Sequence, residues 1–346
     1  MAFELYDFFL TSIILLSWYF TLWNLYAMIY EQPCNAENLM KHCSQYAIPK
    51  ADILNVETQN SGNALIVSSA EYLGQLVVVK QWVGGVGIPH VSRVLFTKRL
   101  IRDLDRWRAL EHPNIAPILG VALHLSNFPA LVVPFHRTAR DLLTESPDAD
   151  VLNLLQGVVA GLSYLHGQNP PITHGDLKGS TVFVSPAGRA LLSDIGIPAI
   201  PQPPDWGFHG VDDARWLAPE IMDPALRPSV AGSGENSART PNSHLPVTPE
   251  SDIYSFGMLA YEMYTRARPF ASTAWAAAVV VRVVTGKRPR RPSKDQSPQL
   301  SSEMWDLIQL CWAQNYRDRP HIHVLVAWLE VFTGMRAVEC IPFSLS

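Results

Sequence analysis

The sequence has little cysteine, little charge and no surplus of basic residues, and each shortage narrows what the protein can be. The four cysteines are Cys34, Cys43, Cys311 and Cys340. Their spacing fits neither a disulfide framework nor the close pairs that structural zinc needs, so we expect a reducing compartment. Charged residues make up 17% of the chain and the formal net charge is -4. Because nucleic-acid binding needs clustered Lys and Arg, we exclude nucleic acid as a partner.

Hydrophobic residues are abundant, at 48% of 346 residues, so the chain can bury a sizeable core. The longest apolar run, residues 8–30, contains no charged residue. It is long enough to cross a membrane as a helix, and we predict a single transmembrane span. A buried core helix is the alternative. Lys41 and Lys50 follow the run and favour a cytosolic location for the rest of the chain. A soluble cytoplasmic protein is the alternative location.

Hydrophobic periodicity then divides the rest of the chain. The run Ala70–Val83 is rich in β-forming residues after a glycine turn and predicts a strand. Apolar positions recur at helical spacing in Phe96–His112 and again in Val151–His166. Later segments are mainly helical. The exception is 223–249, which is rich in Pro, Ser, Gly and Asn and predicts a flexible surface insert.

Four separated motifs occur in the order typical of protein kinases. They are VVVK ending at Lys80, HGDLKGST at 174–181, SDIG at 193–196 and LAPE at 217–220. The chain therefore resembles the protein kinase superfamily, and the RWLAPE and LCW segments resemble its tyrosine-kinase-like group of Ser/Thr kinases. The resemblance implies an α+β bilobal fold, with a β-rich N-lobe that has one long helix and a larger, mainly helical C-lobe.

This resemblance sets the domain boundaries. The N-lobe is expected at 51–137 and the C-lobe at 138–335, including the insert. A short tail at 1–7 precedes the predicted span, a juxtamembrane segment at 31–50 follows it, and a C-terminal tail occupies 336–346.

The same resemblance implies a phosphoryl-transfer site that uses ATP and Mg²⁺. Lys80 would grip the α and β phosphates. Asp176 would accept the proton of the substrate hydroxyl, and Lys178 would lie beside the γ phosphate, which favours Ser or Thr over Tyr. Asp194 would bind Mg²⁺, and Thr181 stands where a second metal ligand is usually asparagine.

The predicted nucleotide pocket departs from the family pattern. Its phosphate loop keeps one glycine of three, Gly62, so ATP should be held less tightly. Val67 is the last residue of the phosphate-loop motif. Val78 would lie on adenine, where it replaces a smaller residue and narrows the slot. The carbonyl of Pro134 and the amide of His136 would meet the adenine edge.

Three further departures concern orientation and regulation. Asp103 takes the place of a helix glutamate that orients the lysine, and its side chain is one methylene shorter. Gly175 replaces an arginine that usually receives an activation-loop phosphate, and residues 194–220 contain no Ser, Thr or Tyr. Asp213 replaces a threonine that helps dock substrate. We therefore expect no activation by phosphorylation within this segment.

Four residues are assigned structural roles. Glu220 should pair with Arg319, and Asp252 should anchor the catalytic loop from its helix. Cys311 is expected in the core.

Two functions remain open from the sequence. The first is a weak ATP-dependent kinase that phosphorylates Ser or Thr of a protein. The second is an inactive pseudokinase that acts as a membrane-tethered scaffold or switch for a signalling partner.

Overall fold

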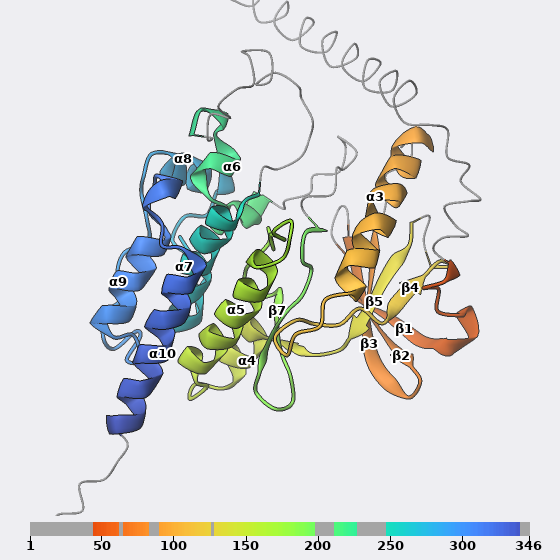
Figure 1. The fold of residues 1–346 in the computed structure, drawn as a ribbon, viewed down its shortest axis with the longest axis horizontal. Coiled ribbons are helices and arrows are strands. Elements are labelled where there is room, and N and C mark those ends of the chain that lie inside the picture. Colours follow the sequence, from red (N-terminus) through yellow and green to blue (C-terminus); the bar gives the residue numbers. More distant parts are fainter. Residues whose placement is uncertain are drawn as a thin grey trace, which may run out of the picture.

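The computed structural model describes residues 44–61, 65–82, 90–125, 128–197, 211–226 and 247–339. They form two lobes, a sheet with one long helix and a larger helical lobe beside it (Figure 1). This arrangement confirms the expected bilobal α+β fold. The predicted span at 8–30 and Gly62 lie outside the described residues. Within the described part of the chain, no helix combines the length and hydropathy that a membrane crossing requires.

The smaller lobe is built on a five-stranded antiparallel sheet with the order β1-β2-β3-β5-β4. The strands are β1 (Ile53–Ser61), β2 (Leu65–Tyr72), β3 (Gln75–Trp82), β4 (Gly120–Ala122) and β5 (Ala130–Pro134), and a short 3-10 helix η1 (Lys50–Asp52) precedes them. The predicted strand at 70–83 is thus two strands joined by a turn, in which Gly74 has a φ of 74°.

The long helix α3 (His90–Arg108) packs on this sheet through aromatic contacts. The ring centroid of Phe96 lies 5.6 Å from that of Trp82 and 5.4 Å from that of Phe128. The helix begins and ends earlier than the expected Phe96–His112. Its early end has a local reason, because His112 precedes Pro113 and a residue before proline disfavours the helical conformation.

The end of the predicted juxtamembrane segment is joined to the smaller lobe. The Ile48 amide donates to the Val121 carbonyl at 2.8 Å, and the Val121 amide donates to the Tyr46 carbonyl at 2.9 Å. The Tyr46 hydroxyl also donates to Asp105 of α3. Gly120 permits this approach, since a Cβ there would lie 2.7 Å from the Tyr46 carbonyl oxygen.

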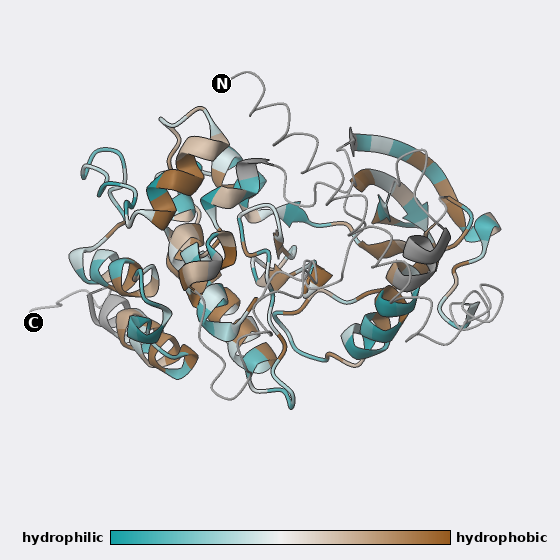
Figure 2. Ribbon diagram, turned by 90° about the horizontal axis from the view of Figure 1, so that it is seen from above, coloured by the Kyte–Doolittle hydropathy of each residue, from teal (hydrophilic) through white to brown (hydrophobic). Residues whose placement is uncertain are grey.

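The larger lobe is mainly helical, and its hydrophobic residues are concentrated where the helices pack against one another (Figure 2). Its helices are α4 (Ala139–Glu145), α5 (Val151–His166), α6 (Pro219–Met222), α7 (Pro249–Thr265), α8 (Ala276–Val284), α9 (Ser302–Cys311) and α10 (Ile322–Glu339). The bounds predicted for α5 are confirmed. Three short strands, β6 (Arg137–Thr138), β7 (Val182–Val184) and β8 (Ala190–Leu192), form a second sheet. The 3-10 helices η3 (Val211–Arg215), η4 (Pro224–Leu226) and η6 (Tyr316–Asp318) complete the lobe.

Two structural expectations for this lobe are confirmed. Arg319 donates to both carboxylate oxygens of Glu220, at 2.6 and 2.8 Å, and both side chains are buried. Cys311 has no exposed surface, and burial raises the pKa of its thiol. The ends of the predicted insert lie in described structure, because η4 starts at Pro224 and Thr248 caps the N-terminus of α7.

Candidate functional site

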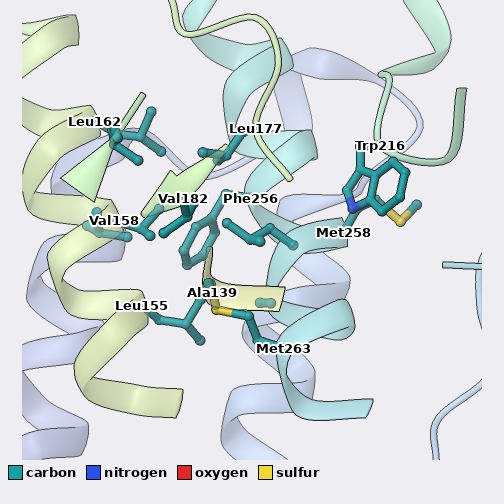
Figure 3. Packing of buried hydrophobic residues seen from close by; sticks show 14 of the residues in the cluster. Ala139, Leu155, Val158, Leu162, Leu177, Val182, Trp216, Phe256, Met258 and Met263 are labelled. Carbon is teal, nitrogen blue, oxygen red and sulfur yellow. The ribbon is translucent and has the colours of Figure 1, made fainter. Parts of the chain in front are cut away.

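The loop that carries the predicted catalytic residues is fixed by the core beneath it. Leu177 and Val182 are fully buried and lie beside Leu155, Val158 and Phe256, which come from α5 and α7 (Figure 3). Within the loop, Leu177 and Gly179 are buried, whereas Asp176 and Lys178 are partly exposed.

Asp252 of α7 holds the backbone at the start of this loop. Its two carboxylate oxygens accept from the amides of His174 and Gly175, each at 2.8 Å, and the Asp252 side chain is buried. This confirms the anchoring role predicted for Asp252. Gly175 has a φ of 79°, a conformation that glycine adopts without strain.

Lys80 of β3 and Asp194, which follows β8, form an ion pair across the cleft. The Lys80 Nζ lies 2.5 Å from both carboxylate oxygens of Asp194, and the exposed fractions of the two side chains are 7% and 16%. Burial alone would raise the pKa of Asp194, but Lys80 lowers it overall. Asp194 has a φ of 61°, which Asp tolerates better than most residues.

Asp176 and Lys178 form a second ion pair two residues apart in the same loop. The Lys178 Nζ lies 2.8 Å from Asp176 Oδ1. Burial raises the pKa of Asp176 to about 6, since it outweighs the opposite effect of Lys178. Asp194 also raises the pKa of Asp176, so the two ion pairs are close enough to interact electrostatically. The four residues assigned to phosphoryl transfer thus lie in one region.

The sequence did not predict the contact between Lys178 and Asp213 in η3. The Lys178 Nζ lies 2.9 Å from Asp213 Oδ1, so the ammonium lies between two carboxylates. Burial alone would lower the pKa of Lys178, but Asp176 and Asp213 raise it overall. The only sequence signal was the replacement of a threonine at this position by an acid.

Thr181 is a poor match for a metal ligand. Its hydroxyl donates to the Asp176 carbonyl at 2.6 Å and accepts from the Lys178 amide at 3.1 Å. Within the described ranges, no group of three or more His, Cys, Asp or Glu residues could hold a metal ion. A hard cation in this site would therefore be held mainly by the Asp194 carboxylate together with oxygens of the nucleotide, and the residues fit one Mg²⁺ better than two.

Phe183 of β7 changes the predicted adenine slot, and the sequence reasoning missed it. Val78, Val133 and Phe183 belong to one buried cluster with Ala116 and Leu191, and Val67 packs against it. Val78 and Phe183 are 8% and 4% exposed. The Lys80 Nζ lies 5.2 Å from the Phe183 ring centroid. Side chains from both lobes thus meet at the level where adenine is expected.

The remaining nucleotide-binding candidates lie around this cluster. Pro134 ends β5 opposite Val77, and the His136 ring centroid lies 6.3 Å from that of Phe183. Val67 pairs directly with Lys80 in the sheet. Four candidates, Val67, Val78, Pro134 and His136, therefore lie in the strands and the connection that border the cleft.

Asp103 of α3 does not contact Lys80. Among the described residues, the basic group within 4.0 Å of its carboxylate is Arg102, whose side chain is 70% exposed. Burial raises the pKa of Asp103 overall, although the nearby Arg102, Arg106 and Arg99 act in the opposite direction. The residue that orients the Lys80 amine in this structure is Asp194.

Comparisons with known proteins agree with this geometry. A family profile described as "Protein kinase domain" matches residues 90–328. The chain is 24% identical over 300 residues to the probable serine/threonine-protein kinase pats1 of Dictyostelium discoideum, which covers 82% of this chain and 8% of that protein. It is 29% identical over 250 residues to receptor-interacting serine/threonine-protein kinase 3 of Rattus norvegicus, covering 66% and 47% of the two chains. It is 27% identical over 250 residues to kinase suppressor of Ras 2 of Homo sapiens, covering 67% and 24%. The chain thus spans less than half the length of each of these relatives.

Proposed function

The chain belongs to the protein kinase family, and from this premise we propose that it transfers a phosphoryl group from ATP, weakly, to a Ser or Thr hydroxyl of a protein. The observation that carries the proposal is the pair of ion pairs in the cleft, Lys80 with Asp194 and Asp176 with Lys178. Positioning and charge stabilisation are most of what phosphoryl transfer requires of a protein, and these four residues supply them.

Each residue has a distinct role in this proposal. Bound ATP supplies the phosphoryl group, and a divalent cation such as Mg²⁺ neutralises its charge. The Asp194 carboxylate would hold the cation, and the Lys80 ammonium would hold the phosphates. Asp176 would take the proton of the acceptor hydroxyl, and its raised pKa of about 6 makes it a better base than an ordinary aspartate while leaving it ionised near neutral pH. Lys178 would place positive charge beside the transferred group.

The proposal specifies weak activity because the nucleotide side is altered. Phe183 and Val78 belong to one buried apolar cluster, and the Thr181 hydroxyl is bonded to the loop backbone. Binding ATP would require the base to displace part of the packing of this cluster, which costs part of the binding free energy.

The packed Val78 and Phe183 favour a second candidate function, an inactive scaffold or switch. If adenine cannot enter, no nucleotide connects the two lobes, and the surface they form would still be available to a protein partner. In both candidates we propose that residues 8–30 attach the chain to a membrane, on the strength of their uncharged sequence.

Two measurements on the full chain test the enzyme proposal. The first is the shift of the unfolding temperature on adding ATP and Mg²⁺, since a ligand that binds the folded state stabilises it. The second is transfer of labelled phosphate to the chain itself and to a general protein acceptor. We expect a small positive shift and slow transfer, with Asp176→Asn lowering the rate about 10²- to 10⁴-fold.

Asp148→Asn is the matched control, because Asp148 is an exposed aspartate outside the site. It should leave both measurements unchanged. A stabilising shift without transfer would support the scaffold. If ATP and Mg²⁺ cause no shift and no phosphate is transferred, the enzyme proposal is contradicted.

A further inference from the structure

One ammonium group in the catalytic loop binds two carboxylates. The Lys178 Nζ lies 2.8 Å from Asp176 and 2.9 Å from Asp213, and the exposed fractions of the three side chains are 15%, 21% and 22%. Because charge-assisted hydrogen bonds in a largely buried setting are stronger than neutral ones, this cluster fixes the relative positions of the loop and of η3.

Asp213 is attached to a rigid part of the C-lobe. Two residues after it, the buried Arg215 donates to the carbonyls of Pro269, Phe270 and Thr273 at 2.8 to 2.9 Å. A guanidinium held by three carbonyls leaves η3 little freedom. The Asp213 carboxylate is therefore presented to Lys178 from a fixed base.

A second connection joins the same two segments. The buried Glu262 of α7 accepts from the Trp216 indole at 2.8 Å and from the Gly179 amide at 3.0 Å. Trp216 follows η3, and Gly179 follows Lys178. The segments are thus joined at one point by Asp213 and Lys178 and at another by Glu262.

We propose that Asp213 is a positioning residue for phosphoryl transfer, whose carboxylate holds Lys178 beside Asp176 and fixes the end of the activation segment without any phosphate. This inference rests on the proposed function. Residues 194–220 contain no Ser, Thr or Tyr that a phosphate could modify, whereas Asp213 supplies a permanent negative charge at the catalytic loop.

The geometry is compatible with catalysis. A lysine ammonium has three donors, and Asp176 and Asp213 use two of them. One N–H of Lys178 is then left for an oxygen of the transferred group. Without Asp213, the flexible four-carbon side chain of Lys178 would sample more positions, and fewer of them would be productive.

Steady-state kinetics on the full chain test this role. The variants are Asp213→Ala, Asp213→Asn and the control Asp148→Ala at an exposed site. We expect Asp213→Ala to lower kcat about 10- to 100-fold, from the loss of a charged hydrogen bond, while KM for ATP changes less than about twofold. Asp213→Asn keeps an oxygen that accepts from Lys178 and should recover part of the lost kcat. Equal or higher kcat in Asp213→Ala than in the wild type would overturn the proposal.

Hydrogen exchange separates this test from the test of the enzyme function. If the wild type transfers no phosphate, the proposed function is wrong, and so is a role of Asp213 in catalysis. Amide exchange then decides whether Asp213 still fixes the end of the activation segment. Faster amide exchange at 214–217 in Asp213→Ala than in Asp148→Ala would support the fixing role. Equal exchange in the two variants would overturn it, even if kcat were lowered in Asp213→Ala.

Discussion

The two sides of the candidate site differ in how firmly they are held. On the C-lobe side, Asp252 binds two amides of the catalytic loop, Glu262 binds a third, and Leu177 lies in the core. On the N-lobe side, Lys80 has its ion pair with Asp194, which comes from the other lobe, and no contact with Asp103. The residues proposed for proton transfer are therefore supported by their own lobe, whereas the lysine proposed to bind phosphate depends on the opposite one.

For the proposed phosphoryl transfer, this difference indicates which step would be impaired. The C-lobe side keeps a carboxylate, an ammonium and a fixed backbone, which are the parts proposed to act on the acceptor hydroxyl. The N-lobe side has apolar contact between Val78 and the cluster of Phe183 at the level of the base. In the proposed function, nucleotide binding, more than proton transfer, would therefore limit the rate.

The largest expected effect comes from breaking the C-lobe side at Asp252. Asp252→Ala leaves the buried amides of His174 and Gly175 without their acceptor. Each of the two unsatisfied buried donors costs about 1 to 3 kcal/mol, so we expect unfolding in urea to show a loss of about 2 to 6 kcal/mol.

Glu250→Ala is the matched control, because Glu250 lies in the same first turn of α7. Its side chain contributes through the helix dipole, which is worth less than about 1 kcal/mol. Equal losses in the two variants would show that Asp252 does not hold the loop.

The second prediction concerns the N-lobe side, where a smaller side chain should make more room for adenine. Val78→Ala removes two methyl groups from the buried cluster that contains Phe183, and the room gained where adenine is expected should tighten ATP binding about tenfold. The measurement is the shift of the unfolding temperature as ATP is titrated in the presence of Mg²⁺.

Val77→Ala controls for the loss of buried volume. Val77 is adjacent in β3, but it is buried in the cluster on the other face of the sheet. We expect it to lower stability and leave the ATP-dependent shift unchanged. An identical shift in Val78→Ala and the wild type would mean that this contact does not restrict the nucleotide.

Local patterns were enough to predict much of the fold. The apolar spacing in Val151–His166 predicted α5 with its observed bounds, because a buried helix needs a continuous apolar face. The kinase-like order of motifs also predicted the ion pair of Glu220 with Arg319 across 99 residues. The first of these predictions rests on local spacing, whereas the second was implied by the family resemblance and not by any local pattern.

The contacts that alter the site could not be predicted in the same way. Phe183 lies in a short apolar run that reads as a buried strand, and nothing in that run shows that Val78 would be its partner. Asp213 and Lys178 are 35 residues apart, and Glu262 and Gly179 are 83 apart. Such pairs are fixed by how separate elements pack, so the departures at Val78 and Asp213 were visible in the sequence but their contacts were not.

The smallest expected effect comes from lengthening the side chain at Asp103. Asp103→Glu adds one methylene and brings a carboxylate closer to Lys80, but the Lys80 amine already binds both oxygens of Asp194 at 2.5 Å. A further partly exposed ion pair is worth about 0 to 1 kcal/mol, so kcat/KM for ATP should rise at most about fivefold. Asp103→Ala is the control and should lower it less than twofold, because Asp103 does not contact Lys80. A tenfold loss in Asp103→Ala would show that α3 moves toward Lys80 during turnover, and the N-lobe side would then be better supported than its contacts indicate.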